Sequence, residues 1–251
     1  MELLNLLNIN YMQLILVLVA AFLIGFSKTG ISGVSMISIP ILAAVFGGKE
    51  STGVVLPILI AADIFAITFY RRHVEWSNIK RVLPWALAGL AIGVLVGNLI
   101  NDKQFKILIS VTVLICLALL IYMEKKGEAV KVPEKAWFYI MTGVVVGFAS
   151  MIGNAAGPIF SVYLLALGFK KNDFIGTSAW FFFIINLTKL PLQVFFWKNI
   201  HIDNLIFVGL GLIPIALGAF AGYFFVKKIN EKPFRYIVIV MIALACVRLF
   251  V

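Results

Sequence analysis

Long, nearly uncharged stretches of apolar residues restrict this chain to a membrane fold. Residues 82–99 and 107–123 are two examples. Each approaches the roughly 20 residues that a helix needs to cross the hydrocarbon core of a bilayer. Only 13% of the residues are charged, whereas soluble domains contain about 25%. A transmembrane β-barrel would show alternating segments of about ten residues, and the sequence has none. We therefore predict an all-α polytopic membrane protein.

The apolar segments follow one another in two similar series. The first series comprises residues 11–26, 34–46, 51–70, 82–100 and 105–123, and the second comprises residues 136–148, 159–169, 174–197, 205–226 and 234–251. The longest polar stretch separates the two series. We therefore predict a first transmembrane repeat at residues 1–123, a linker at 124–135 and a second transmembrane repeat at 136–251.

Individual residues recur between the two series as well. The matches are Gly25-Phe26 with Gly147-Phe148, Gly53 with Gly176, Asp63 with Asn186, Gly93 and Gly97 with Gly218 and Gly222, and the turn at residues 101–106 with the turn at 230–235. A strongly hydrophobic composition produces some of these matches by chance. The turn, however, recurs at the corresponding place in the series, which indicates an internal duplication.

The distribution of Lys and Arg indicates that the two repeats are inverted. Residues 71–81 hold four basic residues, but their counterpart at 198–203 holds one. At the second pair of loops the imbalance is reversed, because residues 227–235 are richer in basic residues than residues 101–106. Basic loops remain cytoplasmic, so equivalent loops lie on opposite sides. This topology places the linker in the cytoplasm and both termini outside.

Two glycine-bearing breaks interrupt the apolar segments, at residues 25–33 and 147–158. Non-helical backbone at membrane depth survives only where it is buried in protein or lines a wet cavity. Inversion requires an odd number of crossings per repeat, and three full spans follow each break. Each broken segment is therefore a hairpin that enters and returns, or a pair of short, tilted spans. We expect the two breaks to face each other and to form the binding site of a transporter.

The first break carries a lysine with several hydrogen-bond donors around it. A lysine among apolar residues is expensive in a membrane and marks a functional site by default. Helix N-termini near such a break attract anions. The alternative is a lysine that snorkels to the interface. The candidate anion-binding residues here are Lys28, Ser27, Thr29, Gly30, Ser32 and Gly33.

The second break and the span that follows it supply the remaining candidates. Gly157-Pro158 suits the start of a helix, and Pro191 is expected to kink the span at 174–197. A second intramembrane lysine, Lys189, strengthens the case for an anion. The alternative for the break is a glycine-lined contact between helices. The candidate residues are Ser150, Gly153, Asn154, Gly157, Asn186 and Lys189.

Asp63 is the one acidic residue well inside a predicted span. It is a candidate proton carrier that couples transport to a proton gradient. A structural ion pair with a lysine, such as Lys189, is an equal alternative. Removing one partner of a buried pair leaves a costly lone charge, so both alternatives predict sensitivity to substitution.

Other functional classes find little support. The two cysteines lie within apolar runs, and the two histidines lie in loops without ligand-spaced partners, so we expect no disulfide, metal or cofactor. The sequence lacks HExxH and GxSxG motifs, which argues against an enzyme. The net charge of +10 reflects topology rather than nucleic-acid binding. The glycines Gly89, Gly93 and Gly97 fit close helix packing, within one protomer or in a homodimer.

Several of these motifs resemble the sulfite exporter TauE/SafE family of membrane permeases, over essentially the whole chain. The resemblance is carried by the glycine-bearing break near each repeat start, Gly157-Pro158 followed by Tyr163-Leu164-Leu165, Gly176-Thr177, and Asn186 with Lys189. It implies transport of sulfur-containing anions such as sulfite or organosulfonates, usually export, driven by protons or the membrane potential.

The functional prediction is therefore a secondary transporter in the inner (cytoplasmic) membrane, multi-pass, that moves a small sulfur-containing anion. Its site lies at the interface of the two broken hairpins, and its partners are the anion, the bilayer and protons. The alternative is an anion channel or facilitator without ion coupling, which would show no dependence on ion gradients.

Overall fold

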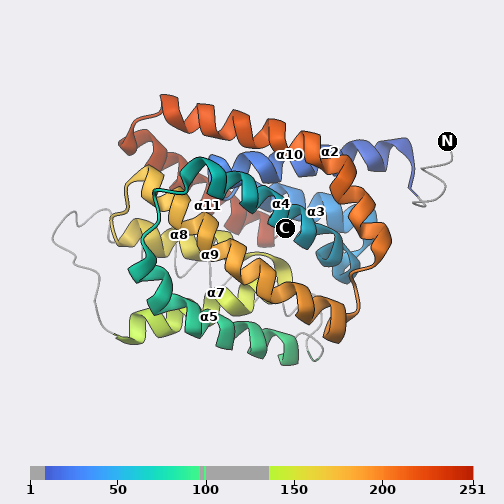
Figure 1. Cartoon of the computed structure of the whole chain (residues 1–251), viewed down its shortest axis with the longest axis horizontal. Coiled ribbons are helices and arrows are strands. Elements are labelled where there is room, and N and C mark those ends of the chain that lie inside the picture. The colour runs from blue at the N-terminus through green and yellow to red at the C-terminus, as the bar shows by residue number, and fades with distance from the viewer. Residues whose placement is uncertain (1–8, 97–98, 100–135, 251) are drawn as a thin grey trace.

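Helices make up almost all of the structure, a computed structural model that describes residues 9–96, 99 and 136–250. The helices are α2 (Tyr11–Thr29), α3 (Ser35–Phe46), α4 (Gly48–Tyr70), α5 (Trp76–Val96), α7 (Ala136–Gly153), α8 (Ala156–Ala166), α9 (Lys171–Leu192), its π-helical extension η2 (Gln193–Trp197), α10 (Ile202–Lys228) and α11 (Glu231–Phe250) (Figure 1). No strand occurs among these described residues. Six of the helices are long and apolar enough to cross a membrane. The chain is therefore an all-helical membrane protein.

The predicted segments correspond to these helices, with shifts at their ends. The span predicted at residues 82–100 begins earlier, at Trp76 of α5, and the span predicted at 174–197 begins at Lys171 of α9. Hydropathy marks only the apolar part of a helix, so polar turns at its ends escape it. The predicted span at 105–123 and the linker at 124–135 lie outside the described residues.

The breaks are shorter than the sequence predicts. Helix α2 continues through Gly25 to Thr29, and α7 continues through Gly147 to Gly153. The interruptions are confined to residues 30–34 and 154–155. Lys28 therefore lies in the last turn of α2, and its predicted place inside an unwound segment is wrong. The physical reason is that Gly25 and Gly147 make room for a neighbouring helix and do not end their own.

The two arms of each broken segment differ in length. Helices α2 and α7 contain 19 and 18 residues, which is within the range of about 17–25 residues that a membrane span needs. Helices α3 and α8 contain 12 and 11 residues, which is too short. Each break thus joins one long helix to one short helix, where the sequence analysis expected two pieces that were both short.

Glycines bring α2 into backbone contact with α10. A Cβ atom on Gly25 would overlap the carbonyl oxygen of Ile215, and one on Gly218 would overlap that of Phe22. Thr29 locks the same pair, because its Oγ1 donates to the carbonyl oxygen of Ala219 at 2.7 Å. Small residues allow membrane helices to approach this closely. A helix of the first half is therefore packed against a helix of the second half.

Helices α5 and α7 repeat this arrangement. A Cβ atom on Gly147 would overlap the carbonyl oxygen of Ala86, and one on Gly89 would overlap that of Val144. Gly89 therefore plays the role of Gly218, one helical turn before the Gly93 that the sequence analysis matched. Glycines that recur every four residues allow such a slip. Figure 1 shows α2 with α10 along one edge and α5 with α7 along the opposite edge.

Helices α4 and α9 lie together between these two pairs (Figure 1). Their N-terminal turns make matching contacts with loops of the opposite half. A Cβ atom on Gly53 would overlap the carbonyl oxygen of Asn199, and one on Gly176 would overlap that of His73. Gly53 and Gly176 are the residues matched in the sequence, so the match extends to their surroundings.

Candidate functional site

A cavity lies where the two breaks meet the middle of the molecule. It is bounded by the end of α2, the starts of α3 and α8, the end of α7, one residue of α4 and the N-terminal two thirds of α9. Its lining residues are Ser27, Lys28, Gly30, Ser32, Ser35, Leu59, Ser150, Asn154, Ala156, Gly157, Phe174, Ile175, Ser178, Ala179, Phe182 and Asn186. The breaks of both halves therefore contribute to one space.

Lys28 places a positive charge at this cavity. Its Nζ lies 2.6 Å from Oδ1 of Asp63, and the lysine side chain is 13% exposed while the aspartate is fully buried. The same Nζ lies 4.7 Å from the ring centroid of Phe182, where a cation is attracted by the face of the ring. Its position in the last turn of α2 adds a favourable interaction with the negative end of the helix dipole.

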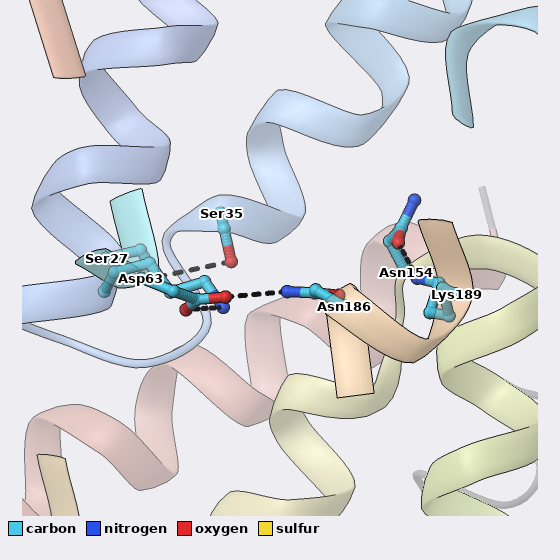
Figure 2. Close-up of polar contacts among 7 residues, drawn as sticks. Ser27, Ser35, Asp63, Asn154, Asn186 and Lys189 are labelled. Carbon is cyan, nitrogen blue, oxygen red and sulfur yellow. Dashed lines mark hydrogen bonds and ion pairs between the residues drawn. The ribbon is translucent and has the colours of Figure 1, made fainter. Parts of the chain in front are cut away.

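Asp63 is held from two sides. Its Oδ2 accepts a hydrogen bond of 2.7 Å from Nδ2 of Asn186 (Figure 2). Its Oδ1 faces Lys28. A buried charge is tolerated when it is paired and hydrogen-bonded in this way. Lys189 is the structural partner of Asp63 that the sequence suggests, but the partner in direct contact is Lys28. Nothing in the sequence indicates which lysine contacts Asp63, because the three residues lie on three different helices.

Lys189 lies behind the cavity wall, with no exposed surface. Its Nζ donates to Oδ1 of Asn154, which does line the cavity (Figure 2). Asn154 has a left-handed backbone with φ of 53°, a conformation that asparagine tolerates better than most residues. The break at residues 154–155 thus turns the amide toward both the lysine and the cavity.

Hydroxyl groups hold the first break in shape. Ser27 Oγ donates to the carbonyl oxygen of Ile31 at 3.1 Å and lies 3.2 Å from Oγ of Ser35, within hydrogen-bond distance. Ser32 Oγ lies 2.6 Å from Oγ of Ser161 on α8, so the two broken segments touch. Ser35 and Ser161 are not among the residues predicted from the sequence. The position of Ser35, two residues after the first break, was a usable signal, whereas nothing in the sequence marked Ser161.

Two helices begin at the cavity. Helix α3 starts at Ser35 and α8 starts at Ala156, and neither has a side-chain cap on its first N–H groups. Ser35, Ala156 and Gly157 all line the cavity. The positive ends of two helix dipoles therefore face the same space as Lys28, an arrangement that favours an anion.

Eight of the predicted binding residues line the cavity, namely Ser27, Lys28, Gly30, Ser32, Ser150, Asn154, Gly157 and Asn186. The other four predicted residues are Thr29, Gly33, Gly153 and Lys189. Thr29 bonds to α10 as described above, and Gly33, with φ of 102°, packs near Met241 of α11. Within the described ranges, no three His, Cys, Asp or Glu residues gather as a metal site would require.

Comparison with known proteins identifies the family. No curated protein and no solved structure matches the chain. A family model, described as sulfite exporter TauE/SafE, matches residues 17–249, which is nearly the whole chain. The match includes both breaks and every residue that lines the cavity. The chain belongs to the sulfite exporter TauE/SafE family of membrane permeases.

Proposed function

We propose that this protein is a secondary transporter that binds a small sulfur-containing anion, sulfite or an organosulfonate, in the cavity between the two breaks. The observation that carries the proposal is the convergence of the Lys28 ammonium with the N-termini of α3 and α8 on one space. Helix N-termini that point at an anionic group are a recurring feature of transporter sites at the membrane midplane.

The polar groups of the cavity suit the oxygens of such an anion. Sulfite and sulfonate groups present three oxygen acceptors on one sulfur atom. The cavity offers hydroxyl donors from Ser32, Ser35, Ser150 and Ser178 and amide donors from Asn154 and Asn186. Charge-assisted hydrogen bonds of this type are roughly twice as strong as neutral ones. The donor set therefore complements the charge of Lys28.

Asp63 provides a means of coupling anion binding to protons. The carboxylate and an anion compete for the same ammonium, because Lys28 already contacts Asp63. A proton on Asp63 releases Lys28 for the anion. By linkage, the anion then favours the protonated carboxyl to the same extent. Anion affinity accordingly rises as pH falls through the titration of Asp63.

Asymmetry between the two halves favours a transporter over a channel. Phe174 and Ile175 of α9 line the cavity. In the register that matches Gly53 with Gly176, the equivalent residues of α4 are Ser51 and Thr52, which do not line it. Nδ2 of Asn199 donates to Oγ1 of Thr52 at 2.8 Å. An exchange of these two environments between inverted halves would provide the alternation that transport requires.

We also propose a membrane, an orientation and a direction of transport for this protein. We infer a multi-pass protein of the cytoplasmic membrane with residues 71–81 on the cytoplasmic side. Export is the direction that the family description implies. The membrane potential, negative inside, assists the outward movement of an anion.

The experiment that tests the proposal is a panel of anions on the purified full-length protein. Sulfite, methanesulfonate, ethanesulfonate, sulfate, acetate and chloride would each be added in a thermal-shift assay. A ligand at 100 times its Kd stabilises the folded state by about 2.7 kcal/mol. We expect sulfite or a sulfonate to stabilise the protein, and to be taken up saturably by proteoliposomes. Absence of a shift with every sulfur anion would overturn the proposal.

A further inference from the structure

The bond between Lys189 and Asn154 fixes the orientation of the amide. A lysine ammonium has only donors, so the atom of Asn154 that faces it must be Oδ1. Nδ2, with its two N–H donors, then points the other way. Figure 2 shows the amide nitrogen of Asn154 directed away from Lys189. Within the part of the chain that the structure describes, no hydrogen-bond partner is found for this Nδ2.

The two cavity amides differ in what their donors already bind. Asn186 donates an N–H to the carboxylate of Asp63, so one of its donors is already bound within the protein. In Asn154 it is the oxygen that is bound, since Oδ1 accepts a hydrogen bond from Lys189. Both N–H groups of Asn154 are therefore available at a cavity that it lines. An amide turned in this way presents donors alone, which is what an oxyanion requires.

The position of Lys189 fits support of this amide and excludes direct contact with a ligand. The lysine has no exposed surface and does not line the cavity. Asn154, in turn, belongs to the two-residue interruption between α7 and α8, outside both helices. With a left-handed backbone and no helix around it, the amide depends on a side-chain partner to keep one orientation.

We propose that Lys189 is a positioning residue, which holds the amide of Asn154 so that its N–H donors face the cavity and bind the anion. This inference rests on the proposed function, because it requires an anion in the cavity. Lys28 supplies charge to the ligand directly, whereas Lys189 acts through Asn154. Without the lysine, the amide is free to rotate and to present its oxygen, which repels an anion.

Substitutions at Asn154 give the sharpest test. Asn154→Asp keeps a partner for Lys189 and a side chain that tolerates the left-handed backbone, but it replaces the N–H donors by a charged oxygen. Asn154→Gly keeps the backbone and removes the side chain. We expect both variants to fold, and to bind sulfite or methanesulfonate at least about tenfold more weakly, the value of a hydrogen bond to a charged group. Asn230→Asp, at an exposed position, is the matched control for added negative charge.

Substitutions at Lys189 test the dependence between the two residues. Lys189→Met should weaken anion binding about as much as Asn154→Gly. Lys189→Gln, which retains an N–H donor toward Asn154, should restore part of the affinity. In the Asn154→Gly background, Lys189→Met should cause no further loss, because the group on which it acts is absent. If Lys189→Met does not fold, Lys189→Gln and Asn154→Asp carry the test.

The outcomes separate this inference from the proposed function. A wild-type protein that binds no sulfur anion would overturn the proposed function itself. A wild-type protein that binds, combined with an Asn154→Asp variant of equal affinity, would overturn the inference alone. Independent losses from Asn154→Gly and Lys189→Met in the double variant would also overturn it, since they would indicate that the lysine acts on the anion directly.

Discussion

Asn186 and Asp63 face each other across α9 and α4, with Nδ2 of the asparagine 2.7 Å from Oδ2 of the aspartate. In the sequence, these two residues occupy matching positions in the two predicted repeats. In the inverted arrangement that we propose, equivalent residues touch each other where the two-fold axis passes between them, so this hydrogen bond would lie on that axis. Of the two side chains, only the carboxyl group of Asp63 can take up and release a proton, so the pair is chemically asymmetric.

Asp63→Asn is the variant that tests coupling. The amide resembles the protonated carboxyl and frees the Lys28 ammonium for an anion. We expect anion binding and exchange to persist in proteoliposomes, while accumulation no longer responds to a pH gradient. The wild type should bind the anion more tightly as pH falls, and this pH dependence should disappear in the variant. Transport by Asp63→Asn with unchanged pH dependence, or failure of the variant to fold, would contradict the coupling hypothesis.

Lys28→Gln tests the charge at the cavity. A hydrogen bond to a charged group contributes about 1.5–3 kcal/mol, so we expect anion affinity to fall by about tenfold or more. Calorimetric titration with sulfite or methanesulfonate measures the change. Lys80→Gln removes the same charge from an exposed site outside the cavity and serves as the control. Equal affinity of Lys28→Gln and wild type would show that this lysine only neutralises Asp63.

Gly25→Ala tests the backbone contact between α2 and α10. The added methyl group would overlap the carbonyl oxygen of Ile215, and overpacking of this kind costs about 1–3 kcal/mol. We expect a lower thermal midpoint in detergent. Gly209→Ala is the matched control, because a Cβ atom there has no neighbour within 4 Å. Similar midpoints for both variants would show that α2 and α10 can separate without loss of stability.

Cysteine labelling tests the inverted topology. Lys80→Cys and His201→Cys, each exposed, would be placed singly in a variant lacking Cys116 and Cys246. In intact cells we expect a membrane-impermeant maleimide to label His201→Cys and to spare Lys80→Cys until the membrane is opened. Equal accessibility of the two positions from one side would contradict the inversion.

The class of fold was predictable because bilayer physics leaves few alternatives for long apolar segments. The helix ends were less predictable. Gly25 and Gly147 read as breaks in the sequence, since glycine weakens a helix, but the structure uses them to admit a neighbouring backbone. That purpose depends on Ile215 and Ala86, which lie far away in the sequence, and no local pattern reports such a contact.

The site was predictable to the extent that polar residues at membrane depth are few. Lys28, Asp63, Asn186 and Lys189 stand out in apolar surroundings. Lys28 and Asn186 both contact Asp63, and Lys189 contacts Asn154, which lines the same cavity as Lys28 and Asn186. Their partners did not follow from the sequence. Each partner is set by which helices lie side by side, so Lys28 rather than Lys189 contacts Asp63. The sequence also did not indicate that Lys189 is fully buried, because burial depends on how the neighbouring helices pack around it.

The glycine contacts that join α2 to α10 and α5 to α7 set an order of events during synthesis. The ribosome delivers α2 to the membrane long before α10 has been made, and α5 before α7. Membrane helices insert first and pack afterwards, so the glycine faces of α2 and α5 meet lipid until the second half arrives. A chain that stops before α7 cannot complete either pair.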